Sequence, residues 1–75
     1  MSQTRASVTP TDVVQFVEEN TTPNSKWIHE TEIVWIFSWY QDAETRHIQR
    51  ALEDAVARDG LEVRGKRYTT PELAT

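Results

Sequence analysis

Hydrophobic side chains recur at helical spacing in the first third of this chain, where they form one stripe: Val13, Val14, Phe16 and Val17. Thr9 is a suitable N-cap, Pro10 suits the first helical position, and Asp12 lies where a carboxylate meets the free N–H groups of the first turn. The polar run over residues 20–25 then interrupts the pattern. The pattern predicts a helix over about residues 10–20.

The most regular pattern lies between Asp42, a candidate cap, and Gly60, a typical helix stop. Its apolar positions follow one another three or four residues apart: Ile48, Ala51, Leu52, Ala55 and Val56. The opposite face is polar and carries Arg46, Gln49, Arg50, Glu53, Asp54 and Arg58. This spacing predicts an amphipathic helix over about residues 43–59.

The segment between these two helices is apolar on nearly all sides. A brief extended piece is expected over residues 26–29. In the following segment, one set of apolar residues has helical spacing: Ile33, Val34, Phe37 and Tyr40. Trp35, Ile36 and Trp39 lie elsewhere around the helix, and many of these residue types also favour strands. Residues 30–40 are therefore predicted as a helix, which the early acids Glu30 and Glu32 favour, with a buried strand as the alternative.

After Gly60 the apolar period changes from 3.6 to 2, which indicates a β-hairpin. A type II′ turn at Gly65-Lys66 would place Val63 opposite Tyr68 on the buried face and Arg64 opposite Arg67. A turn at Arg64-Gly65 would instead place Glu62 opposite Arg67.

These elements predict a mainly α chain with a small hairpin, an α+β class. With 75 residues there is room for one domain, expected over residues 10–70, between a flexible N-terminal tail (1–9) and a C-terminal tail (71–75). The expected core consists of Val13, Phe16, Val17, Phe37, Ile48, Leu52, Val56, Leu61 and Tyr68.

The composition argues against an enzyme and predicts no cofactor. The chain has no cysteine and two glycines, which leaves no thiolate chemistry and no glycine-rich phosphate loop. His29 and His47 share no metal-ligand spacing, and Ser38 lacks the glycines of a nucleophile elbow. No apolar run approaches the roughly 18 residues of a membrane span. We therefore expect a cytoplasmic protein that does not bind a membrane.

The net charge of −4 argues against a general binder of polyanions, but the charge is unevenly distributed. Six of the eight basic residues lie after residue 40, in the last predicted helix and the hairpin. In this half of the chain the positions of the basic residues matter more than the net charge.

Three segments resemble the winged helix-turn-helix superfamily: Ile48-Gln49-Arg50-Ala51-Leu52, Asp59-Gly60-Leu61-Glu62-Val63 and Gly65-Lys66-Arg67-Tyr68. The resemblance implies a three-helix winged helix-turn-helix fold. It also implies a DNA-binding transcriptional regulator, with a recognition helix over about 43–59 in the major groove and a wing over about 61–69 on the DNA backbone. The aromatic segment 35–40 and the acidic composition depart from the pattern of most such regulators.

The expected partner is double-stranded DNA. Arg and Gln side chains suit guanine and adenine edges, so base contacts are expected from Thr45, Arg46, Gln49 and Arg50. Phosphate contacts are expected from Arg64, Lys66 and Arg67. The alternative is that these charges only solvate the surface, with Arg50 pairing to nearby acids along the helix.

Trp35 and Trp39 lie one helical turn apart, away from the Ile33/Phe37 stripe. They belong either to the core or to a partner surface, because tryptophan is enriched at binding hot spots. A surface position would support self-association as a dimer, or the second function that the sequence allows, a protein-interaction winged-helix module.

Overall fold

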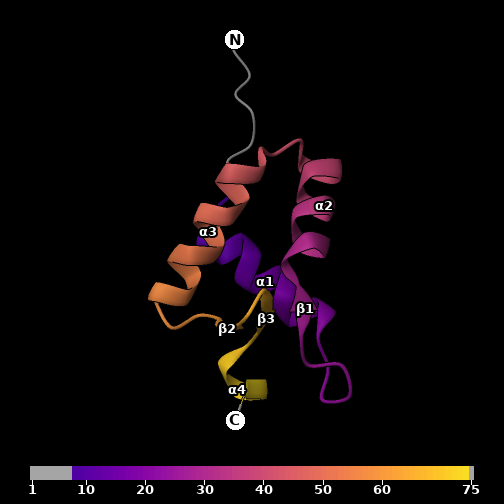
Figure 1. Cartoon of the computed structure of the whole chain (residues 1–75), viewed down its shortest axis with the longest axis vertical. Helices are drawn as coiled ribbons and strands as arrows, with labels where there is room; N and C mark the ends of the chain where they lie inside the picture. The colour runs from indigo at the N-terminus through magenta and orange to yellow at the C-terminus, as the bar shows by residue number, and fades with distance from the viewer. Residues whose placement is uncertain (1–7, 75) are drawn as a thin grey trace.

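The computed structural model describes residues 8–74 as helices and a small antiparallel sheet, an α+β fold (Figure 1). The element order is α1 (Pro10–Asn20), β1 (Ile28–His29), α2 (Glu30–Gln41), α3 (Thr45–Ala57), β2 (Glu62–Arg64), β3 (Arg67–Thr69) and α4 (Pro71–Ala74). All but the last two residues of the expected N-terminal tail lie outside the described residues. Residues 71–74, expected to belong to a C-terminal tail, instead form a single helical turn.

Local hydrogen bonds start the first two helices where the sequence predicts them. Thr9 and Asp12 form a reciprocal capping box: each backbone N–H donates to the other side chain, over 3.0 and 3.1 Å. His29 caps α2, because its Nδ1 accepts a hydrogen bond of 3.1 Å from the backbone N–H of Thr31. Residues 30–41 are helical, so the buried-strand alternative for this segment is wrong.

The three strands pair in the order β1-β3-β2. Val63 pairs with Tyr68 and Arg64 with Arg67, which confirms the register of a two-residue turn at Gly65-Lys66. Gly65 has a φ of 63°, and Lys66 is not among the residues at positive φ, as a type II′ turn requires. The brief extended segment is β1, which pairs with β3 and makes the hairpin a three-stranded sheet.

The core forms where α1, α2 and α3 meet each other and the sheet. Most of the expected core residues are buried, and the remaining two, Phe16 and Val56, are partly buried against them. Phe16 meets Phe37 edge to face, with ring centroids 5.3 Å apart. The core also includes residues outside the expected set, namely Ile28, Ile33, Ala43, Ala51 and Ala55.

Two residues expected on the buried side are exposed. Tyr40 is 72% exposed because α2 buries only one stripe, formed by Ile33 and Phe37. Val63 is 39% exposed, although it pairs with Tyr68 as predicted, because β2 is an edge strand of the sheet.

The end of α3 differs from the expectation that a glycine would cap it. The left-handed residue is Asp59, with a φ of 64°. The N–H of Gly60 donates to the carbonyl of Ala55 over 2.8 Å, and that of Asp59 donates to Val56 over 3.0 Å. These two bonds make a Schellman motif with Asp59 at the position that usually favours glycine. Gly60 is close to α1 instead: a Cβ there would lie 3.0 Å from Cγ2 of Val14, a contact that Val14 would have to shift to accommodate.

Candidate nucleic-acid interface

A row of basic and imidazole side chains crosses the three-stranded sheet. Arg67 on β3 pairs with Arg64 on β2 and with His29 on β1, so all three side chains leave the same face. All three are exposed, as is Lys66 in the turn. The pairing of Arg64 with Arg67 sets two like charges opposite each other, an arrangement that destabilises a hairpin without a counter-charge.

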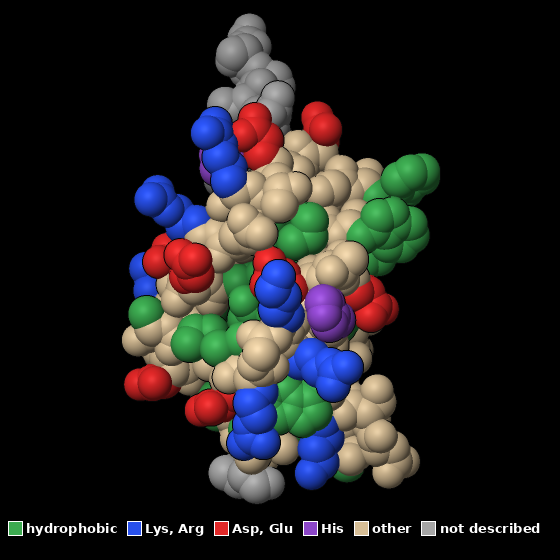
Figure 2. All heavy atoms as spheres, viewed as in Figure 1, with side chains coloured by type: hydrophobic (Ala, Val, Ile, Leu, Met, Phe, Trp, Pro, Cys, Tyr) green, Lys and Arg blue, Asp and Glu red, His purple; other side chains and the backbone are tan. Residues whose placement is uncertain are grey.

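An indole ring adjoins this row. The guanidinium carbon of Arg64 lies 5.2 Å from the centre of a Trp27 ring, within the range of a cation–π contact. Trp27, Arg64 and Arg67 line a shallow hollow of about 320 Å³. Figure 2 shows basic side chains gathered around a hydrophobic patch at the lower end of the molecule. We call Trp27, His29, Arg64, Lys66 and Arg67 the hairpin patch.

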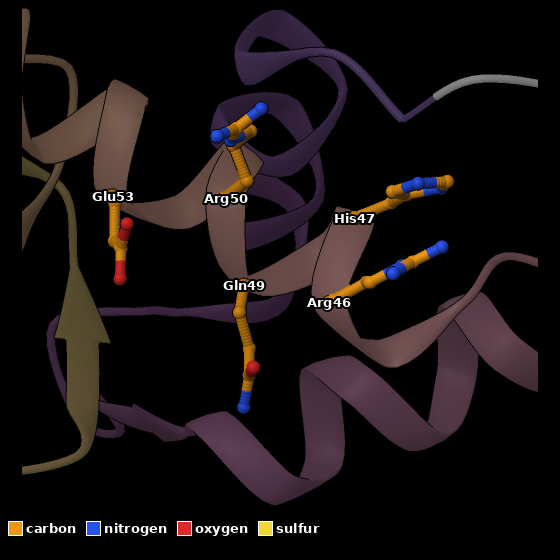
Figure 3. Close-up of a pocket in the computed structure, with 5 residues that line it drawn as sticks. All are labelled: Arg46, His47, Gln49, Arg50 and Glu53. Carbon is orange, nitrogen blue, oxygen red and sulfur yellow. The ribbon is translucent and has the colours of Figure 1, made fainter.

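A second hollow, of about 390 Å³, lies on α3 and is lined by Arg46, His47, Gln49, Arg50 and Glu53 (Figure 3). We call these residues the α3 face. Thr45, the first residue of α3, is exposed but does not line the hollow. The Nε of Arg46 lies 3.1 Å from a carboxylate oxygen of Glu44, so this arginine is already paired to an acid.

The expected base-reading residues do not all point the same way. Figure 3 shows Gln49 directed toward α2, while Arg50 points away from it on the other side of α3. Arg50 also lines a third hollow, beside Pro10 and Asp54. Gln49 and Arg50 therefore occupy two different parts of the α3 surface.

Glu30 joins the α3 face to the hairpin patch. Its backbone N–H donates to the carbonyl of Lys66 over 2.7 Å, and its carboxylate accepts a 3.0 Å hydrogen bond from Nε2 of Gln49. Burial raises the pKa of the Tyr68 phenol, and the nearby carboxylates of Glu30 and Glu53 raise it further. Two acids therefore lie at the junction of the two basic regions.

Trp35 and Trp39 lie on the surface, not in the core. They are 59% and 70% exposed, and their rings stack with centroids 6.1 Å apart and an interplanar angle of 30°. Figure 2 shows hydrophobic side chains projecting from the upper right of the molecule, where Figure 1 places α2. We call this pair the indole stripe.

Sequence reasoning missed three members of this surface: Trp27, His29 as a neighbour of Arg67, and Glu30. The predicted extended segment at 26–29 could have indicated Trp27 and His29, because a third strand beside the hairpin places its side chains next to those of Arg64 and Arg67. Nothing in the spacing could pair Glu30 with Gln49, nineteen positions away.

Within residues 8–74 no group of three or more His, Asp or Glu side chains is placed to hold a metal ion. None of the helices in this range has the length and apolar character needed to cross a membrane. The fold is compatible with a winged-helix arrangement, in which a three-stranded antiparallel sheet accompanies three helices. Comparison of the chain with protein-family models, with curated proteins and with solved structures gave no match.

Proposed function

We propose that this chain is a winged helix-turn-helix DNA-binding protein that regulates transcription. The observation that carries the proposal is the row of Arg64, Arg67 and His29 across the sheet, with Lys66 in the turn, in a protein whose net charge is −4. Like charges set side by side on a hairpin are stabilised by an anion, and the phosphates of a DNA backbone supply a row of anions.

The position of α3 supports the same proposal. Gln49 lies next to the hairpin patch through Glu30, so a duplex that contacts the patch also meets the α3 face. In our proposal the patch binds phosphates, while α3 enters the major groove with Gln49 toward the base edges. Arg50, on the other side of α3 (Figure 3), and Arg46, paired to Glu44, take no part in that contact. One such domain has few phosphate contacts, so tight binding calls for two copies on one site.

The test is a fluorescence anisotropy titration with labelled random-sequence duplex DNA at low and moderate salt. The wild type should bind, and its affinity should fall steeply with salt. Arg64→Ala/Lys66→Ala should weaken binding about equally on all sequences and reduce the salt slope by about two units, roughly one per lost phosphate contact.

The matched control is Arg58→Ala, which removes an exposed arginine at the end of α3 that lines neither hollow. It should bind almost as well as the wild type. If no duplex binds the wild type at low salt, or if Arg58→Ala weakens binding as much as the patch variant, the DNA proposal is wrong.

The indole stripe supports a second candidate function, a protein-interaction module. An aromatic side chain carries about 150–250 Å², so exposed fractions of 59% and 70% leave roughly 200–300 Å² of indole surface. A stable interface buries about 800 Å² per partner, so the stripe would be the anchor of an interface and not the whole of it.

Charge identifies the partner that fits the stripe. Glu32 lies one turn before Trp35 on α2, Asp42 follows the last residue of the helix, and α2 has no basic residue. A second copy packed antiparallel on this stripe would bring acid against acid. The occupant we propose is therefore an amphipathic segment of another protein with apolar residues between cationic ends.

Two fluorescently labelled peptides of matched length, one with lysine ends and one with glutamate ends, test this by the anisotropy of the peptide label. The lysine peptide alone should bind, and Trp35→Ala/Trp39→Ala should abolish binding. Equal binding of both peptides, or of neither, contradicts the proposal. Sedimentation of a dimer that Trp35→Ala/Trp39→Ala dissociates would assign the stripe to a second copy.

A further inference from the structure

The hydrogen bond between Gln49 and Glu30 fixes which atoms the Gln49 amide offers to a ligand. A carboxylate only accepts hydrogen bonds, so the NH₂ group of Gln49 must face Glu30, as it does over 3.0 Å. One hydrogen of that NH₂ is engaged. The second hydrogen and the amide oxygen remain, so Gln49 presents one donor and one acceptor side by side.

Glu30 is itself held in place. Its backbone N–H is bonded to the carbonyl of Lys66 over 2.7 Å, at the junction of β1 and α2. Its side chain is partly buried, whereas the side chain of Gln49 is exposed. The hydrogen bond to a residue whose backbone is held in this way removes rotamer freedom from the exposed amide before any ligand arrives.

We infer that Glu30 is a positioning residue that orients Gln49 to read adenine in the major groove. The inference rests on the proposed DNA-binding function. In the major groove adenine offers an acceptor, N7, beside a donor, the N6 amino group, whereas guanine offers two acceptors. A donor and an acceptor held in one orientation are satisfied together by adenine alone among the four bases.

Glu30 also has an opposing effect. Its carboxylate lies against Gln49, where its negative charge weakens the attraction of any phosphate that approaches this surface. Removing the carboxylate should therefore strengthen DNA binding in general and weaken the preference for adenine. A residue that merely supports the fold would not separate the two effects.

The experiment selects preferred sites from random duplex DNA with the wild type and then measures affinities for the four base pairs at each position. The wild type should prefer adenine at one position by roughly 5- to 150-fold, the range of a good bidentate contact. Gln49→Ala should remove that preference and leave the other positions unchanged.

Three variants then separate hydrogen bonding from charge. Glu30→Ala should reduce the adenine preference to about threefold or less while overall affinity rises. Glu30→Gln should raise affinity equally but keep the preference, because its amide oxygen still accepts from Gln49. Glu53→Gln is the matched control: it removes a carboxylate from the hollow that Gln49 lines, so affinity should rise with the preference unchanged. Equal thermal melting curves confirm that the variants are folded.

Three results would overturn the inference and leave the DNA-binding proposal intact. The adenine preference could survive in Glu30→Ala, it could be lost in Glu30→Gln as much as in Glu30→Ala, or the wild type could show no such preference. Absence of wild-type binding to any duplex at low salt overturns the proposed function, and this inference with it.

Discussion

Replacing Asp59 with glycine should stabilise the protein. Asp59 ends α3 with a φ of 64°, in the left-handed region that is costly for residues with a Cβ. Its carboxylate also lies at the negative end of the helix dipole. This residue leads α3 into β2, so it helps to set the angle between the α3 face and the hairpin patch.

The size of the effect follows from three terms. Relief of left-handed strain contributes about 1 kcal/mol, the lower end of the general range because aspartate tolerates this region better than most residues. Removing the negative charge from the helix end adds about 0.3–1 kcal/mol. The greater freedom of glycine in the unfolded chain costs about 0.4–1 kcal/mol. The net gain is about 0.3–1.6 kcal/mol, a rise in Tm of roughly 1–13 °C for a domain of this size.

Thermal and urea unfolding followed by circular dichroism measure this change. Asp59→Asn should gain only the contribution from removing the charge, and Asp59→Ala should be less stable than Asp59→Gly, since alanine keeps the Cβ strain. Gly60→Ala should also destabilise, by about 1–3 kcal/mol, because its Cβ would lie 3.0 Å from Val14 Cγ2. A lower Tm for Asp59→Gly, or an unchanged Tm for Gly60→Ala, would refute this description of the helix end.

Three further outcomes are expected. Leu52→Ala should cost about 2–5 kcal/mol by urea unfolding, since Leu52 is fully buried, and an unchanged midpoint would contradict its place in the core. The pKa of Tyr68 is raised above 10.0, so the unfolded chain loses its phenolic proton first; the stability this group contributes is complete below pH 10 and is lost as pH rises through the raised value. The free energy of unfolding of the wild type should therefore fall above pH 10, and Tyr68→Phe should lack this fall. Trp27→Leu should free Arg64 from its cation–π contact and weaken duplex binding about two- to fivefold, a change that an Arg64→Ala background should abolish.

The sequence predicted most of the backbone because the local signals agreed with one another. The capping box of Thr9 and Asp12 placed the start of α1, and the strong 3.6 period placed α3 within about two residues at each end. The change to a period of two, with a glycine suited to a type II′ turn, predicted the register of Arg64 against Arg67.

The features that the sequence did not predict depend on contacts between distant segments. Val63 is exposed because β2 lies at the edge of the sheet, a position that no pattern within the hairpin reveals. The left-handed position fell on Asp59 and not on Gly60, where a Cβ would lie 3.0 Å from Cγ2 of Val14. The bond from Gln49 to Glu30 joins two helices whose relative placement only the tertiary fold determines.

The apolar residues of α2 lie on different sides of the helix, and each side has different surroundings. Ile33 and Phe37 form the core stripe, and the first residue, Glu30, joins the α3 face to the hairpin patch. The indoles of Trp35 and Trp39 remain outside, and no element of residues 8–74 buries them. An apolar helix in so small a domain can bury only one stripe, so its remaining apolar side chains either weaken solubility or bind a partner. The same helix therefore takes part in both proposals: Glu30 at its start bonds Gln49, the residue proposed to read DNA, and its outer side carries the indoles proposed to bind a protein.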